Sequence, residues 1–291
     1  MLYIILNPWS DKGKAGQRES LIRSLLNQYH LSFEIARTSG RGEAIALARA
    51  AAERGCYRAV VAAGGDGTIN EIVNGLLGTH VPLGFLPIGT GNDIIKMFDL
   101  SPARLDDAVR RLRDGQVRPV DVGVVNGRAF LNGLGVGFDA CIAVEASRLK
   151  RVHGFAVYVV ALIKALIRFR SPEMTISFDG QTIRRRMLLA SVSNGRCHGG
   201  GFWITPDAEI DDGLFDLCLV NQLRIDEFAR HIPKVLKGRH TRLRQVTMAR
   251  AREVTIDSST PVAAHVDGEI LGTDLRHFEV KLLPGALNVL A

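Results

Sequence analysis

The stretch AVVAAGGDGT at residues 59–68 joins an apolar run to a glycine cluster, and PLGFLPIGTGND at residues 82–93 repeats that arrangement. The runs Ala59–Ala63 and Pro82–Leu86 are typical of buried strands, and a helix-compatible stretch follows each glycine cluster. Glycine lets the backbone turn sharply, and it lets backbone N–H groups come close to a ligand. Ligands of parallel sheets bind at the carboxyl ends of the strands. The two turns therefore predict one ligand site.

The carboxylate inside the first turn indicates what kind of ligand this is. Asp66 would repel a bare phosphate, but it suits a phosphate that carries Mg²⁺. Ordinary strand-to-helix turns, in which Gly, Asp and Asn are common, are the alternative interpretation. The chain has no GxxxxGK[ST] loop, and no GxGxxG opens a helix after its first strand. Two turns at equivalent strand ends favour a site for a magnesium-bound nucleoside triphosphate, and hence phosphoryl transfer.

Size and composition limit the possible classes of protein. A chain of 291 residues with 46% hydrophobic and 23% charged residues predicts two globular domains. A net charge of +7 favours an anionic partner such as nucleic acid, an anionic membrane or an anionic substrate. Cys56, Cys141, Cys197 and Cys218 are scattered, which argues against a zinc site or a disulfide framework and fits a reducing cytoplasm.

Neither apolar stretch that could target a membrane has the required pattern. Residues 1–6 lack a basic flank and run into Asn7-Pro8, so they predict a first strand and not a signal peptide. The apolar stretch Phe155–Ile167 is shorter than the roughly 20 residues that span a bilayer. The sequence therefore predicts a cytoplasmic protein that is soluble or peripheral to the inner face of the membrane.

Short apolar runs alternate with helical patterns as far as residue 122. The predicted strands are Leu2–Leu6, Ser32–Ile35, Ala59–Ala63, Leu83–Leu86 and Val117–Val122. The predicted helices cover about Gly16–Tyr29, Gly42–Arg54, Thr68–Leu77 and Ala103–Asp114. This rhythm predicts a doubly wound parallel sheet, so we assign residues 1–124 to an α/β nucleotide-binding domain.

The pattern changes after Gly123. A helical region is predicted from about Phe138 to Phe169, and mostly strands follow it. These are Met174–Phe178, Ile183–Val192, Leu214–Val220, Glu253–Asp257, Val262–Val266 and Phe278–Leu282. Asp-Gly turns at residues 179, 212 and 267 separate them, as hairpins require. Residues 125–283 therefore predict an antiparallel β domain, a sandwich or a barrel, with a helical insertion.

Three further segments could carry chemistry, and each has an ordinary alternative. The loop from Asn7 to Lys14 has two lysines that could hold phosphates, or it is a solvated loop. The block Glu209–Gly213 crowds three carboxylates, which suits a metal ion or a hairpin turn. Glu269 follows Asp267-Gly268, where it is a reasonable general base for a hydroxyl or simply one of the 30 acidic residues.

A basic run extends from Arg230 to Arg252, with eight Lys or Arg and no Asp or Glu. It is either a solvated helix face or a patch that docks on anionic lipid. Nucleic acid is disfavoured, because no aromatic residue lies in the run to stack on bases.

Together these motifs resemble the diacylglycerol kinase catalytic-domain family, above all its bacterial lipid kinases of the YegS/BmrU type. GGDGT also occurs in NAD kinases, whereas GTGND combined with the later blocks is specific. The shared blocks are NPWSDKGK at 7–14, GGDGT at 64–68 with Asn70-Glu71 and Asn74-Gly75, GTGND at 89–93, DVG at 121–123, GVGFDA at 135–140, NGRCHGGG at 194–201, DDGLFD at 211–216, DGE at 267–269 and PGAL at 284–287.

The resemblance implies an N-terminal nucleotide domain of the NAD kinase/diacylglycerol kinase kind and a C-terminal β-sandwich, with a last strand at about 284–291 returning to the first domain. The implied catalytic residues are Glu269, which matches the base, Asp267 beside it, and Asp66, which would help to position the Mg²⁺–phosphate. A structural Mg²⁺ is implied near Glu209, Asp212 and Leu214, partly through backbone carbonyls. The implied ATP-binding residues are Asn7, Pro8, Ser10, Lys12, Thr38, Gly64, Gly65, Asp66, Gly67, Thr68, Gly89, Thr90 and Asn92.

The implied activity is that of an ATP- and Mg²⁺-dependent lipid kinase of phospholipid biosynthesis. It would phosphorylate a lipid hydroxyl at a membrane surface, with diacylglycerol as the default acceptor and phosphatidic acid as product. The alternatives are a sphingoid base, ceramide, phosphatidylglycerol or a soluble acceptor such as NAD, or a lipid- or nucleotide-binding regulator without catalysis. The sequence leaves a homodimer open.

Overall fold

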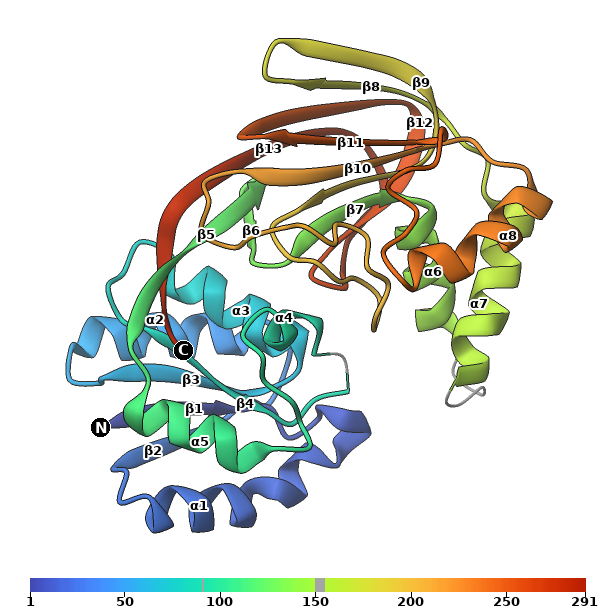
Figure 1. Cartoon of the computed structure of the whole chain (residues 1–291). Coiled ribbons are helices and arrows are strands. Elements are labelled where there is room, and N and C mark those ends of the chain that lie inside the picture. Colours follow the sequence, from blue (N-terminus) through green and yellow to red (C-terminus); the bar gives the residue numbers. More distant parts are fainter. Residues whose placement is uncertain (91, 150–154) are drawn as a thin grey trace.

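The computed structural model describes residues 1–90, 92–149 and 155–291 (Figure 1). Gly91 of the second glycine turn and residues 150–154 of the predicted helical region lie outside the described residues. The chain up to Asp114 forms an α/β layer structure at one end of the molecule, and the remainder forms a mainly β structure at the other end (Figure 1).

The N-terminal part is a doubly wound sheet, as predicted. Its four parallel strands lie in the order β2-β1-β3-β4 and are β1 (Leu2–Leu6), β2 (Phe33–Arg37), β3 (Ala59–Gly64) and β4 (Leu83–Pro87). Its helices are α1 (Glu19–Gln28), α2 (Glu43–Arg54), α3 (Asp66–Leu76), α4 (Asp93–Lys96) and α5 (Leu105–Asp114). Helices α2 and α3 cover one face of the sheet, and α1 and α5 cover the other (Figure 1). Strands β1, β3 and β4 are buried throughout, as expected for a parallel sheet covered on both faces.

The C-terminal part packs two antiparallel layers face to face. Its elements are β5 (Val117–Val125), β6 (Arg128–Phe130), β7 (Gly133–Gly137), α6 (Phe138–Arg148), α7 (Phe155–Arg168), β8 (Glu173–Phe178), β9 (Gln181–Ser193), β10 (Phe215–Asn221), α8 (Ile225–Val235), β11 (Val246–Ala251), β12 (Glu253–Val266) and β13 (Glu269–Leu290). The long strands β9 and β12 pair with β7 in one layer and with β8 in the other. Buried side chains such as Phe130, Phe215 and Phe278 fill the space between the layers. This arrangement is the predicted sandwich.

Strand β13 connects the two parts of the molecule. It begins at Glu269, pairs with β12 and β5, and ends where Val289 lies opposite Leu83 of β4. The C-terminal strand thus adds to the edge of the nucleotide-domain sheet. The division at residues 124/125 and 283/284 stays a prediction.

Several elements differ from the sequence prediction. The helical region at 138–169 contains two helices, α6 and α7, and the two strands predicted at 253–257 and 262–266 are the single strand β12. The basic run is not one solvated helix face, because α8 ends at Val235 and residues 246–251 form β11, which pairs with β10. Among the described residues, no helix has the length and apolarity needed to cross a membrane.

Strand β7 was missed because its sequence GLGVG contains residues that strands usually avoid. The packing around this strand explains why glycine occupies residue 135. A Cβ on Gly135 would lie 1.9 Å from Asp139 Oδ2 and 2.5 Å from His265 Nε2. Glycine is therefore required there for α6 and β12 to pack against this strand.

Candidate active site

Two cavities meet between the nucleotide domain and the sandwich. The larger has a volume of about 620 Å³ and the smaller about 350 Å³. Ser10, Gly65, Gly67 and Glu269 line both cavities. The larger cavity is otherwise lined by Asn7, Trp9, Thr38, Ser39, Gly40, Arg41, Ala44, Thr68 and Glu71, and the smaller by Asp11, Asp66, Gly89, Thr90, Asp93, Asn132, Gly133, His198, Gly199, Gly200, His265, Asp267 and Gly268.

The two glycine turns lie against one another, as their positions after neighbouring strands predict. A Cβ on Gly89 would lie 2.3 Å from Gly65 Cα, so the two backbones touch. The first loop is attached to the same place, because Asn7 Nδ2 donates to Thr68 Oγ1 at 3.0 Å. The result is a surface of backbone and small side chains at the N-terminus of α3, where backbone N–H groups favour an anion.

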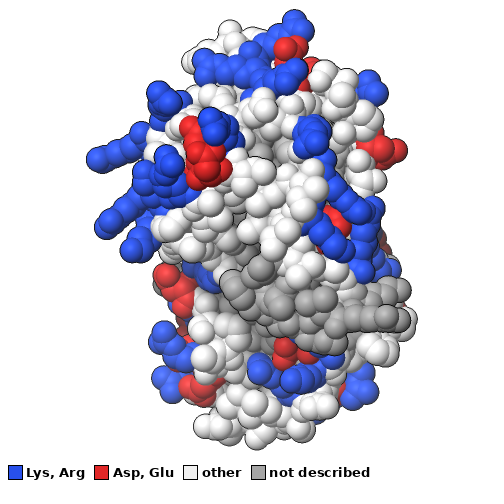
Figure 2. Space-filling view, turned by 90° about the vertical axis from the view of Figure 1, so that its right-hand side faces the viewer, with Lys and Arg blue, Asp and Glu red and all other residues white. Residues whose placement is uncertain are grey.

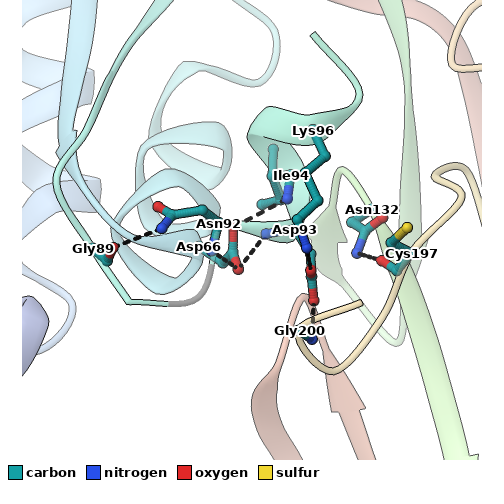
Figure 3. A network of polar contacts seen from close by, with 9 residues as sticks. All are labelled: Asp66, Gly89, Asn92, Asp93, Ile94, Lys96, Asn132, Cys197 and Gly200. Atoms are coloured by element: carbon teal, nitrogen blue, oxygen red, sulfur yellow. Dashed lines mark hydrogen bonds and ion pairs between the residues drawn. The ribbon is translucent and has the colours of Figure 1, made fainter. Parts of the chain in front are cut away.

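Asp66 organises the second turn. Its carboxylate accepts the backbone N–H groups of Asn92, Asp93 and Ile94 at 2.7, 3.0 and 3.1 Å (Figure 3). Burial raises the pKa of Asp66 to about 7, and the nearby Asp93 and Asp267 carboxylates also raise it. The hydrogen bonds from the backbone N–H groups of Asp93 and Ile94 act to lower it. Burial thus favours the protonated form of this carboxyl group.

The raised pKa predicts how the stability contributed by Asp66 depends on pH. Its folded pKa of about 7 exceeds the ordinary 3.8, so this contribution is full below pH 4 and is lost as the pH rises through 7. Without metal, the stability advantage of the wild type over Asp66→Asn should fall by about 2.5 kcal/mol between pH 5 and pH 8. Denaturant unfolding of both proteins at each pH measures this, and a constant difference would contradict the raised pKa.

Asp267 is the centre of a buried network between the two parts of the molecule. Oδ1 accepts the backbone N–H groups of Asn132 and Gly133 at 2.9 and 3.0 Å. Oδ2 accepts Leu131 N–H at 2.9 Å and Asn70 Nδ2 of α3 at 2.8 Å. Burial raises the pKa of this carboxyl group, which these four donors oppose. Asp267 is therefore occupied in holding the start of β7 against α3.

Glu269 is placed differently from these two aspartates. Its side chain is 34% exposed and faces both cavities. A Cβ on Gly67 would lie 2.6 Å from Glu269 Oε1, so the carboxylate sits directly above the first glycine turn. Arg41 is its ion-pair partner. Glu269 is thus the carboxylate best placed to reach reacting groups at the N-terminus of α3.

The remaining residues that were predicted to bind ATP do not all line the same cavity. Thr38 lines the larger cavity, and Thr90 lines the smaller one and donates to Asp11 Oδ1 at 3.2 Å. Asn92 is buried and donates through Nδ2 to Gly89 O at 2.6 Å, so it shapes the second turn (Figure 3). Pro8 and Lys12 line neither cavity.

The predicted structural metal residues lie away from these cavities. Asp212 forms an ion pair with Arg250 and accepts Leu214 N–H at 3.0 Å. Across the described part of the chain, no three His, Cys, Asp or Glu side chains are grouped to hold a metal ion. The nearby Asp216 shares the same cation, because Arg250 Nε lies 3.7 Å from Asp216 Oδ2. Its Oδ2 is buried without a hydrogen-bond partner, and burial, with Asp207 and Glu209, raises its pKa to about 6.

Sequence reasoning missed several residues of the site. Arg41 follows no motif, and only its contact with Glu269 identifies it. Asp93 Oδ2 accepts Gly200 N–H at 2.6 Å, which joins the second glycine turn to the GGG loop of the sandwich (Figure 3). Asp93 belongs to the quoted GTGND block, but the pairing of that block with the GGG loop across the smaller cavity could not be predicted from the sequence.

Two buried histidines line the smaller cavity. His265 Nε2 lies 3.0 Å from Asp139 Oδ2. Burial acts to lower the pKa of His265, but the Asp139 and Asp267 carboxylates together outweigh it, so the pKa is raised. Burial and the neighbouring His265 lower the pKa of His198 to about 4. The smaller cavity therefore has one histidine that favours the charged form and one that stays neutral.

Comparison with known proteins matches both parts of the chain to families. Residues 1–125 match the diacylglycerol kinase catalytic domain, and residues 132–291 match the YegS C-terminal NAD kinase beta sandwich-like domain. A protein named diacylglycerol kinase from Bacillus subtilis is 30% identical over 272 residues, covering 92% of this chain and 89% of that protein. One of the same name from Mycobacterium tuberculosis is 32% identical over 238 residues, covering 80% of this chain and 76% of the relative.

A solved structure supports the same architecture. The crystal structure described as a diacylglycerol kinase from Bacillus anthracis superposes with a TM-score of 0.80 at 25% identity, covering 99% of this chain and 96% of that chain.

Proposed function

We propose that this chain, which belongs to the diacylglycerol kinase family, transfers the γ-phosphoryl group of ATP to a lipid hydroxyl. The names of its relatives support a lipid kinase. The proposed acceptor is diacylglycerol, and the product is then phosphatidic acid. The observation that supports this most directly is the position of Glu269, which faces both cavities above the N-terminus of α3. A base in that position can serve two substrates that approach from different sides.

The nucleotide is proposed to occupy the larger cavity. Asn7, Ser10, Thr38, Gly65, Gly67 and Thr68 of the predicted ATP-binding set line it. Backbone N–H groups at the N-terminus of α3 would bind the phosphates there. The acceptor hydroxyl would then come from the smaller cavity, which His198, His265 and the GGG loop line.

The residues present fit a magnesium ion next to the phosphates. Burial, together with Asp93 and Asp267, raises the pKa of Asp66 to about 7, and a cation next to this carboxyl group would favour its charged form. Asp66 would hold the ion, and the ion would neutralise phosphate charge. Asp93 lies beside it but already pairs with Lys96 at 2.7 Å. Asp66 also keeps the second glycine turn in place through its three backbone hydrogen bonds.

Glu269 is proposed to act as the general base. It takes the proton of the acceptor hydroxyl while that oxygen bonds to the γ-phosphorus, and the bond to the bridging oxygen breaks as ADP departs. Asp267 holds the backbone on both sides of the site and does not need to exchange a proton. Its four hydrogen bonds set the position of the loop that carries Glu269.

A second magnesium ion near Glu209, Asp212 and Leu214 stays a proposal. The negative charge that Asp207, Glu209 and Asp216 bring together would favour a cation in that region, but Arg250 already lies 3.7 Å from Asp216 Oδ2. The ion pair between Asp212 and Arg250 competes with it. The residues therefore fit such an ion in part, and its role would be structural.

Contact with a membrane surface is proposed for the side of the molecule where α7 and α8 lie. Ile163 and Ile167 of α7 and Ile225 of α8 are 51%, 66% and 64% exposed. Figure 2 shows Lys and Arg side chains at both edges of the upper half of this side, with several Asp and Glu among them. Exposed apolar groups among basic ones suit a surface of anionic lipid, to which each basic residue contributes about 1 kcal/mol.

A label-transfer assay tests the proposed activity. We expect γ-labelled ATP with Mg²⁺ to label diacylglycerol in vesicles that contain anionic lipid. Less label should reach diacylglycerol in vesicles of neutral lipid alone, and none should be transferred without Mg²⁺. Sphingoid base, ceramide, phosphatidylglycerol and NAD serve as competing acceptors. Label on one of these alone would replace the acceptor, and ATP binding without transfer to any of them would support a regulator without catalysis.

A further inference from the structure

We propose that Arg41 is a catalytic residue, whose guanidinium binds the transferring phosphoryl group. In the nucleotide-free protein it is held on Glu269 instead. This inference rests on the proposed function and names a residue that no sequence motif assigns. The starting observation is the ion pair between Arg41 and Glu269, which joins the nucleotide domain to the first residue of β13.

Arg41 is presented by an anchored loop. Glu43 accepts both the backbone N–H and the hydroxyl group of Ser39, at 2.6 and 2.7 Å. Glu71 of α3 accepts Gly42 N–H at 2.8 Å and Ala44 N–H at 3.2 Å. The backbone is thus fixed on both sides of Arg41, while its side chain is 70% exposed and ends in the larger cavity. The side chain can change partner without a movement of the loop.

Arg41 is also the only lysine or arginine among the described residues that line either cavity. The carboxylates that line them are Asp11, Asp66, Glu71, Asp93, Asp267 and Glu269. Lys12, which the resemblance implied as a nucleotide ligand, lies outside both. A triphosphate brings several further negative charges, and a metal ion alone leaves the outer phosphate oxygens without a protein cation. Arg41 is the residue that can supply one.

The present partner of Arg41 can be exchanged at little cost. Arg41 and Glu269 are 70% and 34% exposed, and ion pairs of that kind contribute little to stability. A guanidinium binds phosphate through two parallel N–H···O bonds, and such charge-assisted bonds are stronger in a site that excludes water. Nucleotide in the larger cavity would therefore attract Arg41 away from the carboxylate.

The exchange has a consequence for the base. An oxygen of Glu269 that accepts from a guanidinium is not available for the acceptor proton. When Arg41 moves to the γ-phosphoryl group, Glu269 can receive the hydroxyl proton, the hydroxyl oxygen bonds to phosphorus, and ADP leaves with the electrons of the broken bond. Arg41 then stabilises the charge on the equatorial oxygens during transfer. One residue would thus couple nucleotide binding to release of the base.

Three substitutions test this inference. We expect Arg41→Ala to lower kcat by about 10²-fold or more and Arg41→Lys to restore part of it, since lysine keeps the charge but not the paired N–H groups. Added guanidinium ion should restore part of the activity of Arg41→Ala. Arg49→Ala, which removes an exposed arginine of α2 outside both cavities, is the matched control and should retain wild-type kcat.

Nucleotide affinity separates this inference from the proposed function. With Mg²⁺, Arg41→Ala should bind ADP about as well as the wild type does, but should bind a non-hydrolysable ATP analogue about 10-fold more weakly. This readout needs no lipid, so it tests Arg41 even if the wild type phosphorylates none of the lipids offered. Arg41→Ala with unchanged or increased kcat, or with an unchanged ratio of ATP-analogue to ADP affinity, would overturn the inference.

Discussion

The Glu269→Gln variant is expected to fold like the wild type and to transfer phosphate about 10³-fold more slowly. Glutamine has almost the same shape and still reaches both cavities, but it cannot accept a proton at neutral pH. Its amide can keep the contact with the first glycine turn, and the ion pair it loses is partly exposed, so stability should change little. The loss should therefore fall on kcat, with nucleotide affinity kept.

Label transfer to lipid gives kcat for this variant, and thermal unfolding confirms that it is folded. Glu253→Gln is the control, because it makes the same chemical change at an exposed position of β12 far along the strand from the cavities. The control should keep wild-type activity. Glu269→Gln with more than a tenth of the wild-type kcat would show that another group accepts the proton, and the proposed mechanism would then be wrong.

The fold was predictable from the sequence wherever a short-range pattern determined the structure. The parallel strands β1, β3 and β4 of the nucleotide domain are continuous apolar runs, and β1 begins and ends where it was predicted to. Strands could not be predicted from the sequence where tertiary packing overrides the local preference of the residues. Strand β7 has glycine at residue 135 because Asp139 and His265 approach its backbone there. Strand β11 lies in the basic run, and its pairing with β10 was not evident from its sequence.

The candidate site was predictable to the level of motifs but not to the level of roles. The glycine turns predict a phosphate site because the chemistry needs bare backbone, and the structure brings these turns together. Asp66 and Asp267, however, belong to short acidic motifs in which any carboxylate could bind metal. Only the donors around them show that both are engaged by backbone N–H groups. Arg41 could not be identified from the sequence, because its loop matches no motif and its proposed role depends on Glu269, which is 228 positions away.

These roles divide the carboxylates of the site by their surroundings. The buried carboxylates of Asp66 and Asp267, with several fixed donors, hold the loops in place, and the partly exposed carboxylate of Glu269 can react once Arg41 has left it. The same residue type therefore serves stability in one position and chemistry in another. Glu269 and Asp267 are only two residues apart, and substitutions at the two positions should separate these effects.

Asp267→Asn should destabilise the protein by about 4 kcal/mol, with little direct effect on the chemistry of the molecules that stay folded. Each oxygen of the carboxylate accepts from two donors, which include Asn70 Nδ2 and Gly133 N–H. An amide NH₂ in either place leaves two buried donors without an acceptor, and each such donor costs about 1–3 kcal/mol. Because the residue is only 5% exposed, water cannot replace the lost partner.

Thermal unfolding without nucleotide measures this cost, which should lower Tm by roughly 10 °C for a chain of this size. Asp274→Asn is the control, since it removes an exposed carboxylate from the same β-hairpin and should leave Tm within about 1 °C. Below the melting range, Asp267→Asn should keep most of the wild-type kcat. A variant that is as stable as the wild type but inactive would show that Asp267 takes part in the reaction, and the division between holding and reacting carboxylates would have to be abandoned.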